Sequence, residues 1–302
     1  MLRIGTSGWN YPGGRGTWNG IFYPERGNRP RGFDELTFYA ERFNTVEINS
    51  TFYGQPRESA SLGWVKRTPP GFEFAVKLYQ KFTHPKMALD QTAVRVGDID
   101  TFKRGIEPLA TAERLGPLLA QFPASFKSTP ETREYLGWLL ETFADYNVAV
   151  ELRHRSWSDA AAATFDLLHE HGAAWTQIDE PKFRFSVRQD LMPNLKGFYY
   201  MRLHGRNAEQ WWEHENAEDR YNYLYSEAEL RPIVKAVKTA GALVKKRYIY
   251  LNNHFAAQAI ADAAVLRHML DEPIAEPMPA ELVSRYPMLK GKVAIFPPSR
   301  LL

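Results

Sequence analysis

Five charged residues end short apolar runs of the sequence, and together they have the side chains that acid–base catalysis needs. They are Glu47, Lys77, Glu151, Asp179 and Arg202. Two carboxylates that face each other can divide the acid and base roles, and a lysine beside them can donate a proton or form an imine. An arginine can hold an anionic group of a substrate. We therefore predict catalytic roles for Glu47, Lys77, Glu151 and Asp179.

A second set of polar and aromatic residues lies next to the same runs and is predicted to bind a substrate. Amide side chains suit hydroxyl groups, arginine and histidine suit phosphate or carboxylate, and aromatic rings stack on a sugar or a base. The set consists of Trp9, Asn49, Gln121, Arg153, His154, Trp157, Arg202, His204, Tyr223, Asn252 and Asn253. These types indicate a polar, sugar-like small molecule that can carry an anionic or phosphate group.

Side-chain alternation indicates where the charged residues point. Successive side chains of a strand face opposite sides, so Val46 and Ile48 share one face while Glu47 shares the other with Asn49. The runs around Lys77, Glu151 and Arg202 alternate in the same way. If the apolar faces meet helices, all five charged side chains converge on the inner side of a sheet.

The order of elements predicts the scaffold that would bring them together. Strand-like runs alternate with stretches of helical period such as Leu36, Tyr39, Ala40 and Phe43. This pattern predicts an α/β fold with one (β/α)8 TIM-type barrel domain over residues 1–302, in which 271–302 form an irregular, Pro-rich tail. A doubly wound sheet is disfavoured because no G-x-G-x-x-G follows the first strand. The predicted strands centre near Ile4, Val46, Phe74, Leu118, Val150, Thr176, Tyr200 and Ile249.

Capping residues and glycines predict several element ends. Asp34 is expected to begin one helix and Ser158-Asp159 another, whereas Gly172 and Gly241 are expected to end helices. Residues 205–226 are expected to form a long loop at the catalytic end of the barrel.

Composition excludes several classes of protein. The chain has no cysteine, so disulfides, cysteine–zinc sites and a cysteine nucleophile are absent. Its net charge of +3, from 38 basic and 35 acidic residues, is weaker than is usual for a nucleic-acid binder. No apolar run approaches the roughly 20 residues that span a bilayer. A cytoplasmic protein without a membrane partner is expected.

Several motifs spread over nearly the whole chain resemble the DUF72, or YecE-like, family. They include Thr6-Ser7-Gly8-Trp9, Glu47-Ile48-Asn49-Ser50-Thr51, Phe74-Ala75-Val76-Lys77, Glu151-x-Arg153-His154, Arg202-x-His204-Gly205 and Asn252-Asn253-His254. The resemblance implies a TIM-type barrel. It implies no catalytic assignment, so the function rests on the residues themselves.

Two other functions stay open at the level of sequence, as does the choice among hydrolase, lyase and isomerase. A divalent metal could bind Glu47, Glu151, Asp179, His204 and His254, although Lys77 and Arg202 would crowd it with positive charge. The leading hypothesis needs no cofactor. A barrel that binds nucleic acid or protein without catalysis is the second alternative. Under the leading hypothesis, Glu151→Gln is expected to abolish activity and leave thermal stability equal or higher.

Overall fold

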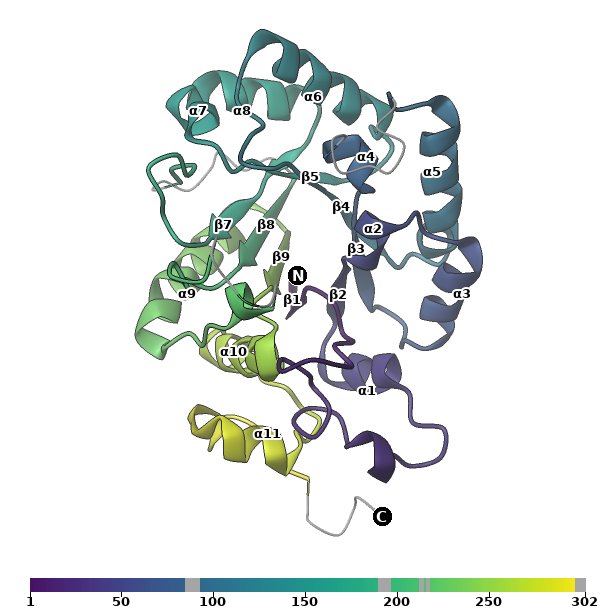
Figure 1. The fold of residues 1–302 in the computed structure, drawn as a ribbon, viewed down its shortest axis with the longest axis vertical. Helices are drawn as coiled ribbons and strands as arrows, with labels where there is room; N and C mark the ends of the chain where they lie inside the picture. The colour runs from purple at the N-terminus through teal and green to yellow at the C-terminus, as the bar shows by residue number, and fades with distance from the viewer. Residues whose placement is uncertain (85–92, 190–196, 212–214, 216–217, 297–302) are drawn as a thin grey trace.

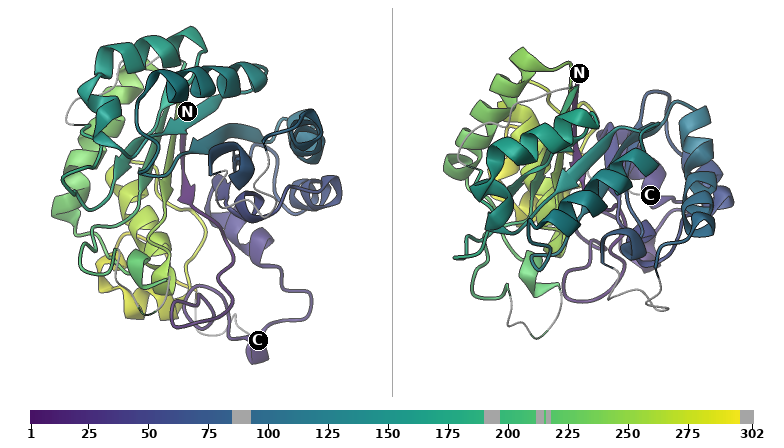
Figure 2. Two further views of the ribbon diagram at one scale, coloured as in Figure 1. Left: turned by 45° about the horizontal axis from the view of Figure 1, so that its top comes forward. Right: turned by 90° about the horizontal axis from the view of Figure 1, so that it is seen from above.

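The chain folds into the predicted α/β barrel, with strands at the centre and helices around them (Figures 1 and 2). The computed structural model describes residues 1–84, 93–189, 197–211, 215 and 218–296. The strands are β1 (Leu2–Thr6), β2 (Thr45–Ile48), β3 (Glu73–Lys77), β4 (Leu115–Gln121), β5 (Val148–Glu151), β6 (Ala174–Trp175), β7 (Gln177–Asp179), β8 (Phe198–Leu203) and β9 (Lys246–Leu251). Seven of the eight predicted strand centres lie inside these strands, whereas Thr176 lies between β6 and β7.

The helices in the described part of the chain follow these strands. They are α1 (Glu35–Arg42), α2 (Ser50–Tyr53), α3 (Glu58–Lys66), α4 (Gln80–Thr83), α5 (Val96–Thr111), α6 (Pro130–Thr142), α7 (Arg155–Asp159), α8 (Ala161–Glu170), α9 (Glu227–Leu243), α10 (Gln258–Met269) and α11 (Ala280–Arg285). None of them combines the length and apolarity needed to cross a bilayer.

All paired strands run parallel, in the orders β1-β9-β8-β7 and β2-β3-β4-β5-β6. The first junction between the two sheets lies between β1 and β2. There the N–H of Gly8 donates to the Glu47 carbonyl at 2.8 Å. Gly5 allows the close approach, because a Cβ at this position would lie 2.2 Å from the Thr45 carbonyl oxygen.

The second junction falls inside the sixth predicted strand, which is interrupted at Thr176. β6 pairs with β5 before the break, and β7 pairs with β8 after it. The side-chain amide of Gln189 spans the break: it donates to the Thr176 carbonyl at 2.8 Å and accepts from the Ile178 N–H at 2.9 Å. This side chain therefore satisfies two backbone groups that a continuous ladder would have paired.

The barrel interior is apolar at mid-height and charged at both ends. Ala75 and Ala149 leave room there, and the rings of Tyr200, Tyr248 and Tyr250 belong to the same buried cluster. The larger core lies between the outer strand faces and the helices. This arrangement agrees with the predicted alternation of side chains on the strands.

Two predicted helix ends are confirmed and two are wrong. Asp34 caps α1 by accepting from the Thr37 N–H at 2.8 Å, and Gly172 follows α8 with φ +66°. Ser158-Asp159 instead lies in the last turn of α7. Gly241 lies inside α9, where its missing side chain makes room for Arg247: a Cβ there would lie 2.4 Å from the guanidinium.

The tail is more regular than predicted. It contains α11, whose Leu282 and Val283 are buried, and a bridge between Met278 and Ile295. The Tyr286 hydroxyl donates to the Ala256 carbonyl at 2.6 Å. The tail therefore packs through regular secondary structure and a buried apolar face, which proline content alone did not reveal.

Candidate functional site

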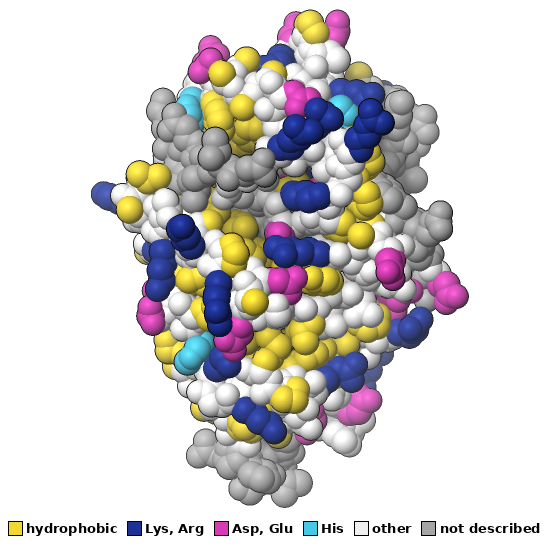
Figure 3. All heavy atoms as spheres, turned by 90° about the vertical axis from the view of Figure 1, so that its left-hand side faces the viewer, with side chains coloured by type: hydrophobic (Ala, Val, Ile, Leu, Met, Phe, Trp, Pro, Cys, Tyr) yellow, Lys and Arg dark blue, Asp and Glu magenta, His cyan; other side chains and the backbone are white. Residues whose placement is uncertain are grey.

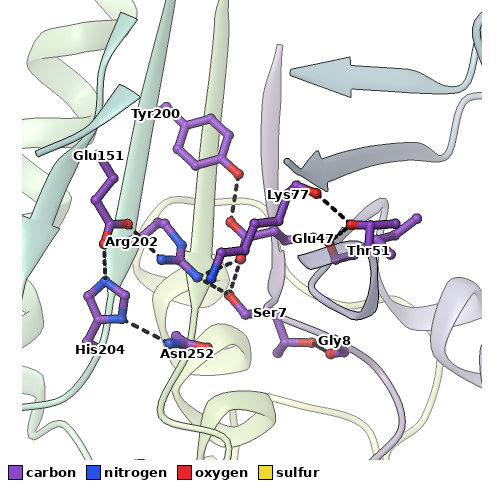
Figure 4. A network of polar contacts seen from close by, with 12 residues as sticks. Ser7, Gly8, Glu47, Thr51, Lys77, Glu151, Tyr200, Arg202, His204 and Asn252 are labelled. Atoms are coloured by element: carbon purple, nitrogen blue, oxygen red, sulfur yellow. Dashed lines mark hydrogen bonds and ion pairs between the residues drawn. The ribbon is translucent and has the colours of Figure 1, made fainter. Parts of the chain in front are cut away.

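Four of the five predicted charged residues meet at the carboxyl ends of their strands, which we call the barrel mouth (Figure 4). Arg202, on β8, lies between the two glutamates. Its guanidinium donates to Glu47, on β2, at 2.7 Å and to Glu151, on β5, at 2.7 Å. All three side chains are at most 1% exposed. The predicted convergence is confirmed for these residues, and the two carboxylates are bridged by one cation.

Neighbouring groups fix the charges of this triad. The Tyr200 hydroxyl donates to Glu47 at 2.7 Å, and the Ser7 hydroxyl donates to the same carboxylate at 2.8 Å. Burial is the largest influence on Glu151 and opposes its ionisation, but Arg202 and Arg153 outweigh it and hold its pKa well below the usual range. Burial opposes the charge of Arg202, but the two glutamates outweigh it and raise the pKa of Arg202. The triad is consequently held together by two buried ion pairs.

A second layer of polar groups surrounds Glu151. Arg153 contacts Glu151 at 2.6 Å and His204 at 3.3 Å. The Asn252 amide lies 2.9 Å from the other ring nitrogen of His204. Burial lowers the pKa of His204 to about 3, so the ring is neutral at pH 7. The Arg153 side chain is 17% exposed, and its guanidinium contacts both Glu151 and Glu180.

Lys77 lies beside the triad but does not join its ion pairs. Among the described residues, no carboxylate oxygen comes within 4.0 Å of its Nζ, which lies 4.0 Å from the centre of the Phe52 ring. Its carbonyl is held by the Thr51 hydroxyl at 2.6 Å. Burial, followed by the positive charge of Arg202, lowers the pKa of Lys77 to about 7. A substantial fraction of this amine is therefore unprotonated near neutral pH.

Three predicted substrate-binding residues lie in the loops or strand ends around this layer without a fixed side-chain partner for their polar groups. Asn49 follows β2, and its buried Oδ1 has no hydrogen-bond partner among the described residues. Gln121 ends β4 in register with Glu151. Trp9 is partly buried and packs edge-on against Trp64. The amides of Asn49 and Gln121 are the neutral hydrogen-bonding groups that these strand ends offer to a solute.

Asp179 does not join the mouth network, and the prediction that it points there is wrong. Its carboxylate holds Arg206 at 2.9 Å and accepts from the Tyr225 hydroxyl at 2.6 Å. The next residue, Glu180, reaches the mouth instead, where its carboxylate lies 3.4 Å from Arg153. The alternation of side chains could not be carried through the break at Thr176, so the sequence pattern did not indicate this change.

Four other predicted binding residues serve the loops around the barrel. Trp157 is fully buried, stacks on Phe126 and donates to its carbonyl at 2.8 Å. His154 caps α7. Tyr223 donates to Glu229 at the start of α9, and Asn253 binds the Tyr223 carbonyl and Asp262. These contacts place none of the four side chains against the glutamate–arginine triad.

The five residues of the metal alternative do not assemble. Arg202 occupies the space between Glu47 and Glu151, Asp179 binds Arg206, and His254 stacks on Tyr11 at 4.1 Å. Within the described ranges, no group of three or more histidine, aspartate or glutamate side chains has a metal-binding arrangement.

Sequence reasoning missed Ser7, Tyr200 and Glu180. Tyr200 lies on β8 two residues before Arg202, so alternation could have found it. Ser7 directly follows β1, and extending the alternation by one residue beyond that strand could have found it. Glu180 lies beyond the strand break, where that signal fails.

Comparisons with known proteins agree with this fold. A family model described as "Protein of unknown function DUF72" matches residues 3–283. The UPF0759 protein YunF of Bacillus subtilis is 27% identical over 90% of this chain and 95% of its own length. A DUF72 family crystal structure from Thermotoga maritima is 35% identical, with a TM-score of 0.75 over 90% of this chain and 100% of that one. One from Enterococcus faecalis is 24% identical, with a TM-score of 0.77 over 90% and 96%.

Proposed function

The chain belongs to the DUF72 family, and we propose that it is an enzyme that performs acid–base chemistry on a small, polar, anionic, sugar-like substrate, with Lys77 as the proton-transferring group. The observation that carries the proposal is the Lys77 amine at the carboxyl end of β3, which has no ion-pair partner among the described residues. Active sites of such barrels form at these strand ends.

Lys77 is suited to accept a proton because its surroundings disfavour the ammonium form. The Nζ is withdrawn from water and lies near Arg202, which lowers its pKa to about 7. A general base works best when its pKa is close to the operating pH. The same unprotonated amine can also attack a carbonyl carbon to form an imine, with loss of water.

Glu47 and Glu151 act as positioning residues in this proposal. Each already accepts a 2.7 Å bond from Arg202, so neither has the free carboxyl that a glycosidase-type acid–base pair requires. Their charges offset that of Arg202 and keep the Lys77 pKa from falling further.

The substrate class follows from the groups that remain available. Arg153 offers its cationic side chain, which is 17% exposed, to a phosphate or carboxylate beside its glutamate partners. Asn49 and Gln121 offer amides for hydroxyl groups. A small hydroxy-carbonyl compound with one anionic group fits this combination.

Proton transfer can be tested without knowing the product. We would incubate the protein in D2O with a panel of sugar phosphates and hydroxy acids, and follow deuterium uptake at carbon by NMR. The wild type should label one compound, and Lys77→Met should not. Lys77→Arg is the matched control that keeps a cation but cannot lose its proton, and it should also be inactive.

Two further measurements test the pKa of Lys77 and distinguish proton transfer from imine formation. Reductive 13C-methylation reports the Lys77 pKa directly, and a value near the ordinary 10.4 would overturn the proposal. Borohydride trapping with the labelled compound should add its mass at Lys77 only if an imine forms. Undiminished labelling by Lys77→Met would also exclude Lys77 as the base.

A further inference from the structure

A cavity lies on the outside of the barrel, and none of the three residues of the glutamate–arginine triad lines it. It has a volume of about 620 Å³ and lies between β7, the segment 182–189 and the first half of α9. Figure 3 shows the face that carries these elements, where Lys and Arg side chains gather across the middle around patches of hydrophobic surface. Small-molecule sites commonly have this size.

The rim of the cavity is cationic and has spare positive charge. Lys182, Arg184 and Arg188 line it, are exposed, and have no carboxylate within 4.0 Å in the described part of the chain. Arg206 also lines it but is already held by Asp179 at 2.9 Å. Arg188 and Lys182 interact only at longer range with the carboxylates of Asp159 and Glu180, so the rim cations are incompletely neutralised and would attract an anion.

The inner wall combines apolar surface with one unsatisfied amide. Val187, Met201 and Ile233 are buried residues that line the cavity. Gln177 lines it too and is only 8% exposed. Its side-chain oxygen accepts from the Tyr199 hydroxyl, whereas its side-chain nitrogen has no partner among the residues that the structure describes. This nitrogen is not among the fully buried atoms that lack a partner, so it is a donor that can be reached from the cavity.

We propose that this cavity binds an organic phosphate, whose phosphate group lies among the rim cations and whose body packs on the apolar wall within reach of Gln177. The organic part of the ligand would add to the affinity through its contact with the apolar wall and a hydrogen bond with the Gln177 amide. Inorganic phosphate, which can meet only the rim, should therefore bind more weakly. This site is independent of the chemistry proposed at the mouth.

Calorimetric titrations with phenyl phosphate, AMP and inorganic phosphate test the proposal at low ionic strength. At least one of the two organic phosphates should bind ten times or more tightly than inorganic phosphate. Arg188→Glu should weaken that binding at least tenfold. The matched control is Lys235→Glu, which makes the same charge change at an exposed position of α9 outside the cavity and should change affinity less than twofold.

A second variant probes the wall. Gln177→Glu keeps an acceptor for Tyr199 but adds a buried negative charge, and should reduce organic phosphate binding more than inorganic phosphate binding. Two results would overturn the proposal: organic phosphates that bind no better than inorganic phosphate, or equal losses in Arg188→Glu and Lys235→Glu. Either would mean that the rim attracts anions by charge alone.

Discussion

The Lys77 amine lies near the carboxylates of Glu47 and Glu151, both of which are already bonded to Arg202. The folded state therefore holds fewer protons at this residue than the unfolded state between pH 7 and about 10.5, and stability rises with pH across that window. Lys77→Met should raise the free energy of unfolding at pH 6 by about 2 kcal/mol.

Urea denaturation at pH 6 and pH 10 checks this expectation. The gain should shrink at pH 10, because the folded lysine is then neutral and losing its proton costs little so close to the ordinary lysine pKa of about 10.4. A stability loss at pH 6 would mean that Lys77 is held by favourable contacts, and would remove the physical basis of its low pKa.

Glu151 should have the opposite effect on stability. The sequence suggested that Glu151→Gln would leave stability equal or higher, but the structure shows this carboxylate buried against Arg202 and Arg153. Removing its charge leaves Arg202 with Glu47 alone and Arg153 with Glu180 alone, so the buried layer has one negative charge too few, at a cost of about 3 kcal/mol. Because its folded pKa is lowered, its contribution is present at neutral pH and is lost as pH falls below about 4.5.

The matched comparison is Asp179→Asn, which breaks an ion pair whose arginine is 38% exposed. That change should cost about 1 kcal/mol or less. Thermal unfolding of both variants at pH 7 distinguishes them, and equal losses would contradict the buried charge network.

The candidate site could be predicted from sequence only where strands are regular. Alternation placed Glu47, Lys77 and Arg202 on the inner faces because their neighbours are plainly apolar. It could not show that Arg202 bridges the two glutamates, because that depends on strand register and barrel closure. The ion pair removes Glu47 and Glu151 from the free acid–base pair that residue types alone had favoured.

At the scale of elements, the sixth strand is where the barrel departs from its regular pattern. Gln189 bonds both sides of the break at Thr176, so Gln189→Ala would leave the Thr176 carbonyl and the Ile178 N–H without these partners. The expected loss is about 1 to 3 kcal/mol. Gln189→Glu retains the acceptor for Ile178 and should lose less.

Hydrogen exchange measures this local effect. The Ile178 amide should exchange faster in Gln189→Ala than in Gln189→Glu, while amides of β2 and β3 keep their protection. Equal protection of Ile178 in all three proteins would show that Gln189 does not hold the break.

The order of elements was predictable because apolar periodicity is a local property of the sequence. Leu36, Tyr39 and Ala40 are indeed buried on α1, as their spacing indicated. The predictions that failed depend on contacts between residues distant in sequence. Gly241 lies inside α9, where the guanidinium of Arg247, from the following strand, fills the space that a side chain would occupy. The tail likewise owes its structure to partners such as Ala256, which lies far from Tyr286 in sequence.

For the whole molecule, buried titratable groups make the free energy of unfolding depend on pH. Burial lowers the pKa of His84 to about 4 and those of His204 and His254 to about 3. The unfolded chain takes up these protons below about pH 6.5 and the folded chain does not, so each histidine costs about 1.4 kcal/mol per pH unit of acidification. Burial raises the pKa values of Glu180 and Asp262, which offsets part of this loss.

A single variant isolates the histidine contribution. His254→Phe keeps an aromatic ring against Tyr11 and removes the titrating group. At pH 8 its stability difference from the wild type reflects packing alone, because histidine is neutral in both states there. Between pH 8 and pH 5 the variant should therefore gain about 2 kcal/mol relative to the wild type. Parallel stability curves over this range would mean that His254 is protonated in the folded barrel, which its enclosure between Tyr11 and Tyr221 opposes.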